Sequence, residues 1–284
     1  MLVPLLVAAT ISVAATTTDL RDLVAVVGGD RVSVESLTDP RHDPHALEIL
    51  PRQLVRLREA RLLVRVGLDH EPWLARALRG QTPPPRDLDL SRTVTLLGTE
   101  TPRLRAERTA HVHAFGNTHY WLDPENARAI TAHIAEALGA LAPADRAVFA
   151  ANRARFIDKL DAGLRRWTAA LTPYAGTRVV AAHDTWPYFA RRFGLTIAAT
   201  IEERPGVPAS PAHVAKLVER MRAARVRVVI GEPAAPTALL RRIAEQTEAR
   251  VVMLAPSVGA DADATDYLTL FDANVRRLTA ALAP

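Results

Sequence analysis

The segment PADRAVFAANRARFIDKLDAGLRRWTAAL, residues 143–171, decides the fold. Its apolar residues keep a helical spacing as far as Pro173: Val148, Phe156, Leu160, Leu164, Trp167 and Leu171. A helix of roughly thirty residues is about 40 Å long at 1.5 Å per residue, which is long for a helix that serves one small domain. We therefore expect one long rigid helix over 143–172 that joins two lobes.

Strand and helix patterns alternate on both sides of this helix. Short apolar runs typical of strands lie at 11–17, 31–36, 62–66, 93–97, 177–182, 195–201, 227–230 and 250–254. Amphipathic stretches typical of helices lie at 19–27, 51–60, 71–79, 124–141, 185–192, 211–224, 236–246 and 266–282. This alternation predicts the α/β class, with a parallel-type sheet and flanking helices in each lobe. We expect an N-terminal lobe over 10–142, a C-terminal lobe over 173–284, and a binding cleft between them.

The composition is that of a globular protein. Of 284 residues 49% are hydrophobic and 24% are charged, and the net charge of +5 comes from 36 Lys and Arg against 31 Asp and Glu. The basic residues are scattered through helical segments and do not alternate with stacking aromatic residues, so we expect no nucleic-acid partner. Because the chain has no cysteine, any transition metal must be held by imidazole and oxygen ligands.

The chain starts with the apolar run MLVPLLVAATISVAA, residues 1–15. The run lacks the basic residues that begin a secretion signal and is too short to span a bilayer. We interpret residues 1–9 as the remnant of an export signal whose true start lies upstream. The alternative is that the whole stretch forms a buried first strand.

Histidines stand at three places where a strand has ended and a loop begins. They are His45 in RHDPHALEILP (41–51), His119 in GNTHYWLDPENA (116–127) and His183 in RVVAAHDTWPYF (178–189). Open α/β sheets place their ligands at such positions. Each histidine alone is weak evidence, but together they predict a convergent site, and imidazole is a favoured zinc ligand.

Motifs along nearly the whole chain resemble those of one family, the cluster A-I solute-binding proteins of ABC importers for zinc and manganese. They are ATTTDLRDLVAVVGGDRVSVESL (15–37), DPHALEILP (43–51), GLDHEPWL (67–74), HYWLDPENA (119–127), VVAAHDTWPYFARRFGL (179–195), VRVVIGEPAAP (226–236), ARVVMLAP (249–256) and YLTLFDANVRRLTAAL (267–282). The resemblance implies a two-lobed fold joined by a long helix. It also implies that His45, His119 and His183 are metal ligands.

The fourth ligand is where the chain departs from the family. An acidic residue commonly stands in a Leu-Asp-Pro unit after the last strand, but here the unit is Leu254-Ala255-Pro256. The fourth position is then filled by water or by a carboxylate from elsewhere. The candidate carboxylates are Asp261, Asp263, Glu202, Glu203 and Glu232.

The other histidines fall into two groups. His42, His111 and His113 lie in loops next to the expected site, and the loop of the last two resembles a shortened His-rich loop of some zinc members, which suggests a weak accessory site. We interpret the remaining three as surface residues on helices: His70, His133 and His213. Asp43 and Asp123 precede prolines and either orient ligand histidines or cap helices.

The resemblance implies a receptor rather than an enzyme. It would be exported, periplasmic or extracytoplasmic, and monomeric, and would deliver its ion to the permease and ATPase subunits of an importer. Nitrogen ligands favour Zn²⁺ over Mn²⁺ as the bound solute. The alternative function is a zinc-dependent hydrolase, because a three-histidine site with an open coordination position can activate water. The chain carries no HExxH motif to support it.

Overall fold

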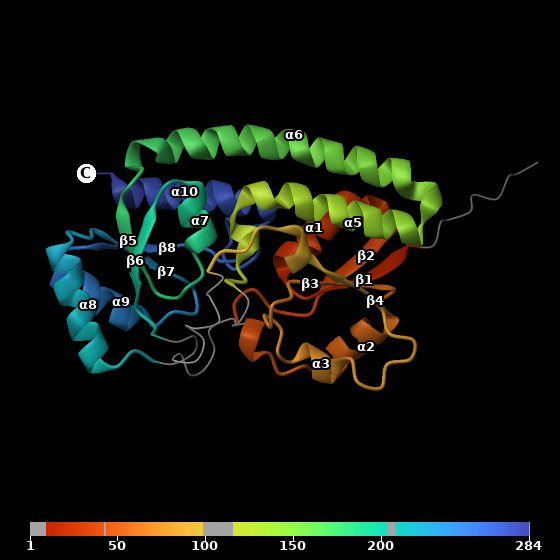
Figure 1. Cartoon of the computed structure of the whole chain (residues 1–284), viewed down its shortest axis with the longest axis horizontal. Coiled ribbons are helices and arrows are strands. Elements are labelled where there is room, and N and C mark those ends of the chain that lie inside the picture. Colours follow the sequence, from red (N-terminus) through yellow and green to blue (C-terminus); the bar gives the residue numbers. More distant parts are fainter. Residues whose placement is uncertain (1–9, 43, 99–115, 204–207, 284) are drawn as a thin grey trace, which may run out of the picture.

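The computed structural model describes residues 10–42, 44–98, 116–203 and 208–283. The expected export segment 1–9, Asp43, and His111 with His113 therefore lie outside the described residues. Two lobes stand side by side, each built around one parallel sheet, and the long helix α6 runs across both (Figure 1). This arrangement confirms the fold class expected from the sequence.

The N-terminal lobe contains a four-stranded sheet in the order β2-β1-β3-β4, with all neighbours parallel. The strands are β1 (Ile11–Ala15), β2 (Val32–Ser36), β3 (Leu62–Arg65) and β4 (Arg86–Asp89). The helices are α1 (Thr18–Gly28), α2 (Pro51–Glu59), α3 (Leu74–Ala77) and α5 (Ala127–Leu141). Helix α1 begins directly after β1 because the hydroxyl of Thr17 accepts a hydrogen bond from the Leu20 amide and caps the helix.

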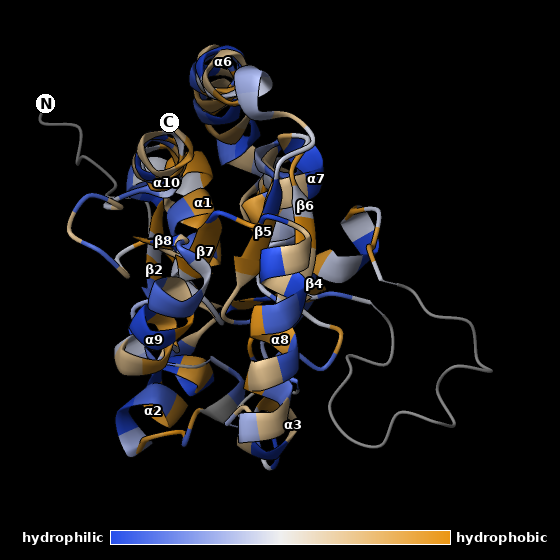
Figure 2. Ribbon diagram, turned by 90° about the vertical axis from the view of Figure 1, so that its left-hand side faces the viewer, coloured by the Kyte–Doolittle hydropathy of each residue, from blue (hydrophilic) through white to orange (hydrophobic). Residues whose placement is uncertain are grey.

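The C-terminal lobe repeats this topology. Its four strands run in the order β6-β5-β7-β8, again all parallel. The strands are β5 (Arg178–Ala181), β6 (Thr196–Thr200), β7 (Val228–Gly231) and β8 (Arg250–Met253). The helices are α7 (Pro187–Arg192), α8 (Pro211–Ala223), α9 (Thr237–Thr247) and α10 (Tyr267–Leu282). Figure 2 shows hydrophobic strand segments in the interior and helices, such as α8, with mixed polar and apolar faces.

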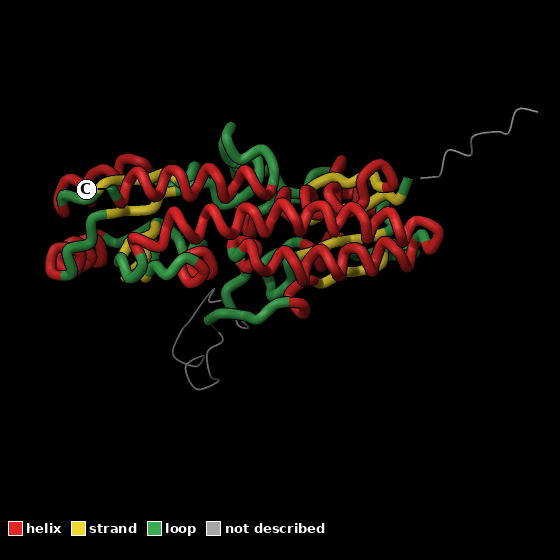
Figure 3. Tube along the Cα trace, turned by 90° about the horizontal axis from the view of Figure 1, so that it is seen from above, coloured by secondary structure: helices red, strands yellow, loops and turns green. Residues whose placement is uncertain are grey.

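Helix α6 (Arg146–Leu171) is 26 residues long and follows a 3₁₀ turn at Pro143–Asp145, which confirms the long helix expected from the sequence. It packs against α1 and α5 of the first lobe and α10 of the second, and Figure 3 shows it running along the length of the molecule. The ring of Trp167 lies 5.1 Å from that of Phe271 in α10. One continuous apolar core therefore includes side chains of both lobes and of α6.

Two of the expected elements are wrong. Residues 93–97 form no strand, and the edge strand of the first sheet is β4, seven residues earlier. The sequence RDLDL is too charged to be recognised as a strand, but the Arg65 guanidinium on β3 pairs with Asp87 at 2.8 Å and with Asp89 at 3.0 Å across the ladder. The helix expected at 71–79 is only the short α3, Leu74–Ala77.

No helix in the described part of the chain is both long and apolar enough to cross a membrane.

Asp19, near the start of α1, ties the lobes together. One carboxylate oxygen accepts a hydrogen bond of 3.0 Å from the amide of Val258, which follows β8 in the other lobe. Burial raises the pKa of Asp19 from 3.8 to about 7, although the backbone hydrogen bond acts in the opposite direction. The folded protein therefore holds a proton on this group more tightly than the unfolded chain does.

We expect Asp19→Asn to change how stability depends on pH. Because the folded-state pKa is raised, stability is lost as pH rises from 3.8 to about 7, and the full cost is present above that range. The neutral amide removes this cost, so at pH 8 the variant should be more stable by on the order of 4 kcal/mol, with no gain at pH 4. Urea unfolding at both pH values measures the difference. An equal effect at pH 4 and pH 8 would contradict the explanation.

Candidate metal centre

The carboxyl ends of the strands in both sheets face one cleft between the lobes. A pocket of about 260 Å³ lies there, with Thr17 and His45 from the first lobe and His183, Glu202 and Glu232 from the second among its lining residues. Parallel sheets bind ligands at this edge because the chain leaves each strand there into a loop. The expected location of the site is thus a real cavity.

The histidine rings in this cleft lie close together. The ring centroid of His119 lies 5.7 Å from that of His45 and 5.7 Å from that of His183, and His45 lies 6.5 Å from His183. His45 belongs to a 3₁₀ turn at Pro44–Ala46, His119 precedes another at Tyr120–Leu122, and His183 follows β5. The structure therefore brings the three histidines expected from the sequence into one cluster.

Outer hydrogen bonds set the orientation of these rings. Nδ1 of His45 lies 3.0 Å from the carbonyl oxygen of His70, and Nδ1 of His183 lies 3.0 Å from a carboxylate oxygen of Glu202. Nδ1 of His119 lies 3.3 Å from the side-chain oxygen of Asn117. Each of these partners is an acceptor, so Nδ1 carries the proton in the neutral ring and Nε2 carries the lone pair that can bind a metal. Metal-binding histidines are held in this way.

His70 is a correction to the sequence analysis. It was expected on a surface helix, but it follows β3 in a tight turn and its side chain is fully buried. Its ring centroid lies 4.4 Å from that of His45 and 5.8 Å from that of His119. One ligand atom from each of these three histidines lies within 4.8 Å of the others. The strand-end rule that identified His45 applies equally to His70 and would have found it.

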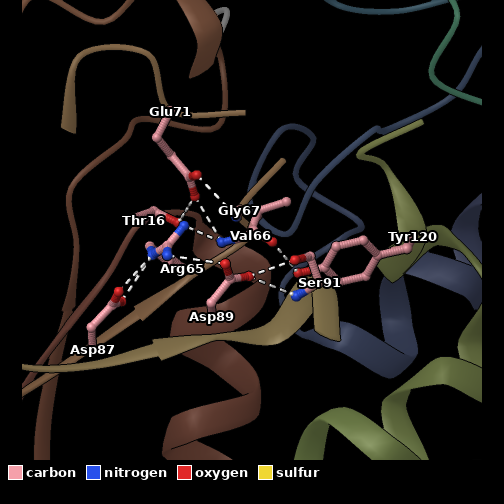
Figure 4. Close-up of polar contacts among 9 residues, drawn as sticks. All are labelled: Thr16, Arg65, Val66, Gly67, Glu71, Asp87, Asp89, Ser91 and Tyr120. Carbon is pink, nitrogen blue, oxygen red and sulfur yellow. Dashed lines mark hydrogen bonds and ion pairs between the residues drawn. The ribbon is translucent and has the colours of Figure 1, made fainter. Parts of the chain in front are cut away.

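A buried carboxylate holds the turn that carries His70. Glu71 accepts hydrogen bonds from the amides of Val66 and Gly67 at 2.7 and 3.0 Å and from the Thr16 hydroxyl at 2.5 Å (Figure 4). Burial raises the pKa of Glu71 to about 7, against the effect of these hydrogen bonds. The network ties the end of β3 to the end of β1 and closes the turn 66–71, in which His70 directly precedes Glu71.

Two tryptophans pack against the histidine cluster or the turn beside it. The indole N–H of Trp73 donates to the carbonyl of Pro44, beside His45. The ring of Trp121 lies 5.3 Å from His70 and 5.2 Å from His119, and its N–H donates to the carbonyl of Pro256 in the other lobe.

The five candidate carboxylates for the fourth position fall into two groups, those that line the pocket and those that do not. Glu202 and Glu232 line the pocket, where Glu202 contacts His183 and Glu232 accepts a hydrogen bond of 2.9 Å from the Trp186 indole. Burial raises the pKa of Glu232. Burial lowers the pKa of His183, but the bond to Glu202 and the charge of Glu232 outweigh it and leave that pKa above 6.5.

The other three carboxylates are engaged with different partners. Asp261 and Asp263 form ion pairs with Arg277 at 2.8 and 3.3 Å, and the first of these pairs lowers the pKa of Asp261. Glu203 lies 3.3 Å from His213, whose side chain is only 17% exposed and so is not the surface residue expected. Ala255 is fully buried in the apolar core.

The remaining expectations concern residues around the site. Asp123 caps the 3₁₀ turn at Pro124–Asn126 and forms an ion pair with Arg192, so its capping role is the one observed. His42 is exposed at the pocket and lies 3.8 Å from Asp39. His133 is exposed on α5, as expected.

A family model described as "ZnuA: Zinc-uptake complex component A periplasmic" matches residues 13–281. The chain belongs to this family. Curated family members similar to this chain carry the name "High-affinity zinc uptake system protein ZnuA". The one from Brucella abortus strain 2308 is 31% identical over 143 residues, 50% of this chain and 42% of that protein. The one from Paracoccus denitrificans is 30% identical over 204 residues, 63% of each. The match thus spans less than half the length of the Brucella ZnuA.

Solved ZnuA structures match almost end to end. A structure titled "Crystal structure of ZnuA" is 25% identical with a TM-score of 0.83 and covers 96% of this chain and 100% of that one. A zinc-bound ZnuA deletion mutant matches at a TM-score of 0.82 with 25% identity over 97% of this chain and 99% of that one. A manganese-bound periplasmic protein from Candidatus Liberibacter asiaticus, 17% identical, has a TM-score of 0.83 over 96% of this chain and all of that one, and shares the fold.

Proposed function

We propose that the chain is an exported receptor that captures zinc in the interlobe cleft and delivers it to the permease and ATPase subunits of an ABC importer. The observation that carries the proposal is the convergence of His45, His119 and His183, from both lobes, on one pocket. The names of the similar zinc-uptake proteins support the same cargo. We further propose lobes at 10–142 and 173–284 joined by 143–172, an export segment at 1–9, and a monomeric state.

The ligand chemistry favours zinc over manganese. The nitrogen atoms of His45, His119 and His183 suit zinc, whereas manganese prefers oxygen donors. Glu202 lies against the Nδ1 edge of His183, where it raises the basicity of the imidazole instead of supplying an oxygen ligand. The mechanism is capture without catalysis: the ion displaces protons and water from imidazoles that the fold has already oriented.

Turnover assays test the receptor against the rival hydrolase. The zinc-loaded protein should hydrolyse ester, amide and phosphate substrates no faster than free zinc does. Zinc-dependent turnover that disappears in His119→Ala would show that the protein is an enzyme and contradict the receptor function.

Zinc should stabilise the folded protein. Binding to the native state alone adds about 2.7 kcal/mol at zinc one hundredfold above Kd. Calorimetric melting of a chelator-stripped sample, with and without zinc, measures the gain, and His133→Ala, which alters an exposed histidine, should show the same gain. An unchanged melting temperature in both zinc and manganese would rule out the cleft as a metal site.

A further inference from the structure

We propose that His70 is a fourth zinc ligand, so that the site holds its ion with imidazole nitrogens alone. The proposal rests on the proposed receptor function and deepens it, because it fixes the ligand set and with it the choice of metal. Sequence reasoning left the fourth position to water or to one of several carboxylates.

The distances support a ligand role. Zinc bound tetrahedrally at 2.0–2.1 Å from each nitrogen requires nitrogens about 3.3 Å apart. Candidate ligand atoms of His45, His70 and His119 already lie within 4.8 Å of one another, so small side-chain shifts suffice. The ring of His183 lies 5.7 Å from that of His119 and approaches from the other lobe. The first lobe thus offers three imidazoles and the second lobe one.

The backbone turn that carries His70 is conformationally strained. Leu68 and Asp69 both have a φ of 57°, a left-handed backbone conformation that residues other than glycine rarely adopt. Such strain persists where surrounding contacts enforce it, and it gathers at functional sites. Here the Glu71 carboxylate enforces it through the amides of Val66 and Gly67 (Figure 4). The turn therefore aims a buried imidazole at the cluster, where a hydrophobic side chain would suffice for packing.

A hydrogen bond to a hydroxyl, which can accept or donate, also holds the ring of His70. Its Nδ1 lies 2.9 Å from the Thr118 hydroxyl, which directly precedes His119 in the sequence. Its own carbonyl oxygen accepts the hydrogen bond from Nδ1 of His45. His70 is thus linked by short paths to both neighbouring ligands, and in the proposed site its Nε2 binds the ion.

The fourth imidazole explains why Ala255 is tolerated. The family's usual acidic position is here a buried apolar residue, in a unit whose backbone is held by Asn274. An imidazole from the first lobe takes over the missing coordination. Exchanging an anionic oxygen donor for a neutral nitrogen donor shifts the preference further from manganese toward zinc.

X-ray absorption at the zinc edge and calorimetric titration of chelator-stripped protein test the assignment. The wild type should bind one zinc ion with four imidazoles. His70→Asn, whose side chain can still bond to Thr118 but has no nitrogen in the Nε2 position, should bind zinc with three imidazoles and one oxygen. Its affinity should be at least about a hundredfold lower, since loss of an outer partner alone costs 10–100-fold. His133→Ala should match the wild type.

The outcomes separate the two proposals. If the wild type binds zinc with three imidazoles, and His70→Asn keeps that number and the wild-type affinity, His70 is only a packing residue and the inference fails while the receptor function stands. If the wild type binds no zinc, the receptor function fails as well. Apo-state melting of His70→Asn distinguishes a lost ligand from a lost fold, and His70→Ala, without the amide, provides a second variant for the same count.

Discussion

Replacing His119 by alanine should lower zinc affinity about a thousandfold, or about 4 kcal/mol. His119 is buried at the centre of the cluster, with its ring 5.7 to 5.8 Å from those of His45, His70 and His183. Its loss removes one nitrogen and also the ring against which Trp121 packs, so the cavity left behind loosens the rest of the cluster. Titration against a competing chelator of known affinity measures the change.

The matched control for this variant is His133→Ala. His133 is an exposed histidine on α5, where Nδ1 donates to the Ala129 carbonyl, and it is not one of the residues that line the pocket. It serves better than His213, which is partly buried beside Glu203. Equal affinities for His119→Ala and His133→Ala would place the metal elsewhere.

Zinc affinity should fall on the order of a thousandfold between pH 7.5 and pH 5.5. A protonated imidazole cannot bind a metal, and three imidazoles that behaved as free histidine, with a pKa near 6.5, would each weaken binding by up to about tenfold over this interval. The raised pKa of His183 means that protons begin to compete at that residue above pH 6.5. Titrations at several pH values, with the chelator's own protonation included, give the slope.

A companion variant tests whether the charge of Glu202 sets the pH at which protons begin to compete with zinc for His183. Glu202→Gln keeps a hydrogen-bond acceptor beside His183 but removes the negative charge that favours its protonation. The pH at which affinity begins to fall should therefore move downward in this variant. Affinity that stays flat from pH 7.5 to 5.5 in the wild type would mean that carboxylates, not imidazoles, dominate the site.

Strong periodicity is what made most of the fold predictable from sequence. The alternating apolar runs of the second lobe and the helical rhythm of 143–171 predicted β5 to β8 and α6, because burial on a sheet or along one helix face forces those spacings. Strand β4 was missed because it is an edge strand held by ion pairs to Arg65, and its sequence carries little apolar signal.

The site was predicted in part for a related reason. His45, His119 and His183 stand in loops that the motifs made visible, but His70 was assigned to a helix that begins only at Leu74. Its burial depends on the turn that Glu71 holds and on Trp121, which comes from a distant part of the chain. The strand-end rule could have placed His70 beside the cleft, but sequence spacing does not encode the contacts that bury it.

The apolar core that runs through both lobes and α6 has a consequence for how the ion leaves. Parting the lobes would expose side chains such as Trp167 and Phe271, at roughly 25 cal/mol for each Å² of apolar surface brought into water. In a receptor built in this way, the free-energy cost of exposing this core keeps the two lobes from separating on their own. Under the proposed function, the work of releasing the ion falls on the importer, which must shift the turns that carry the imidazoles until these no longer converge.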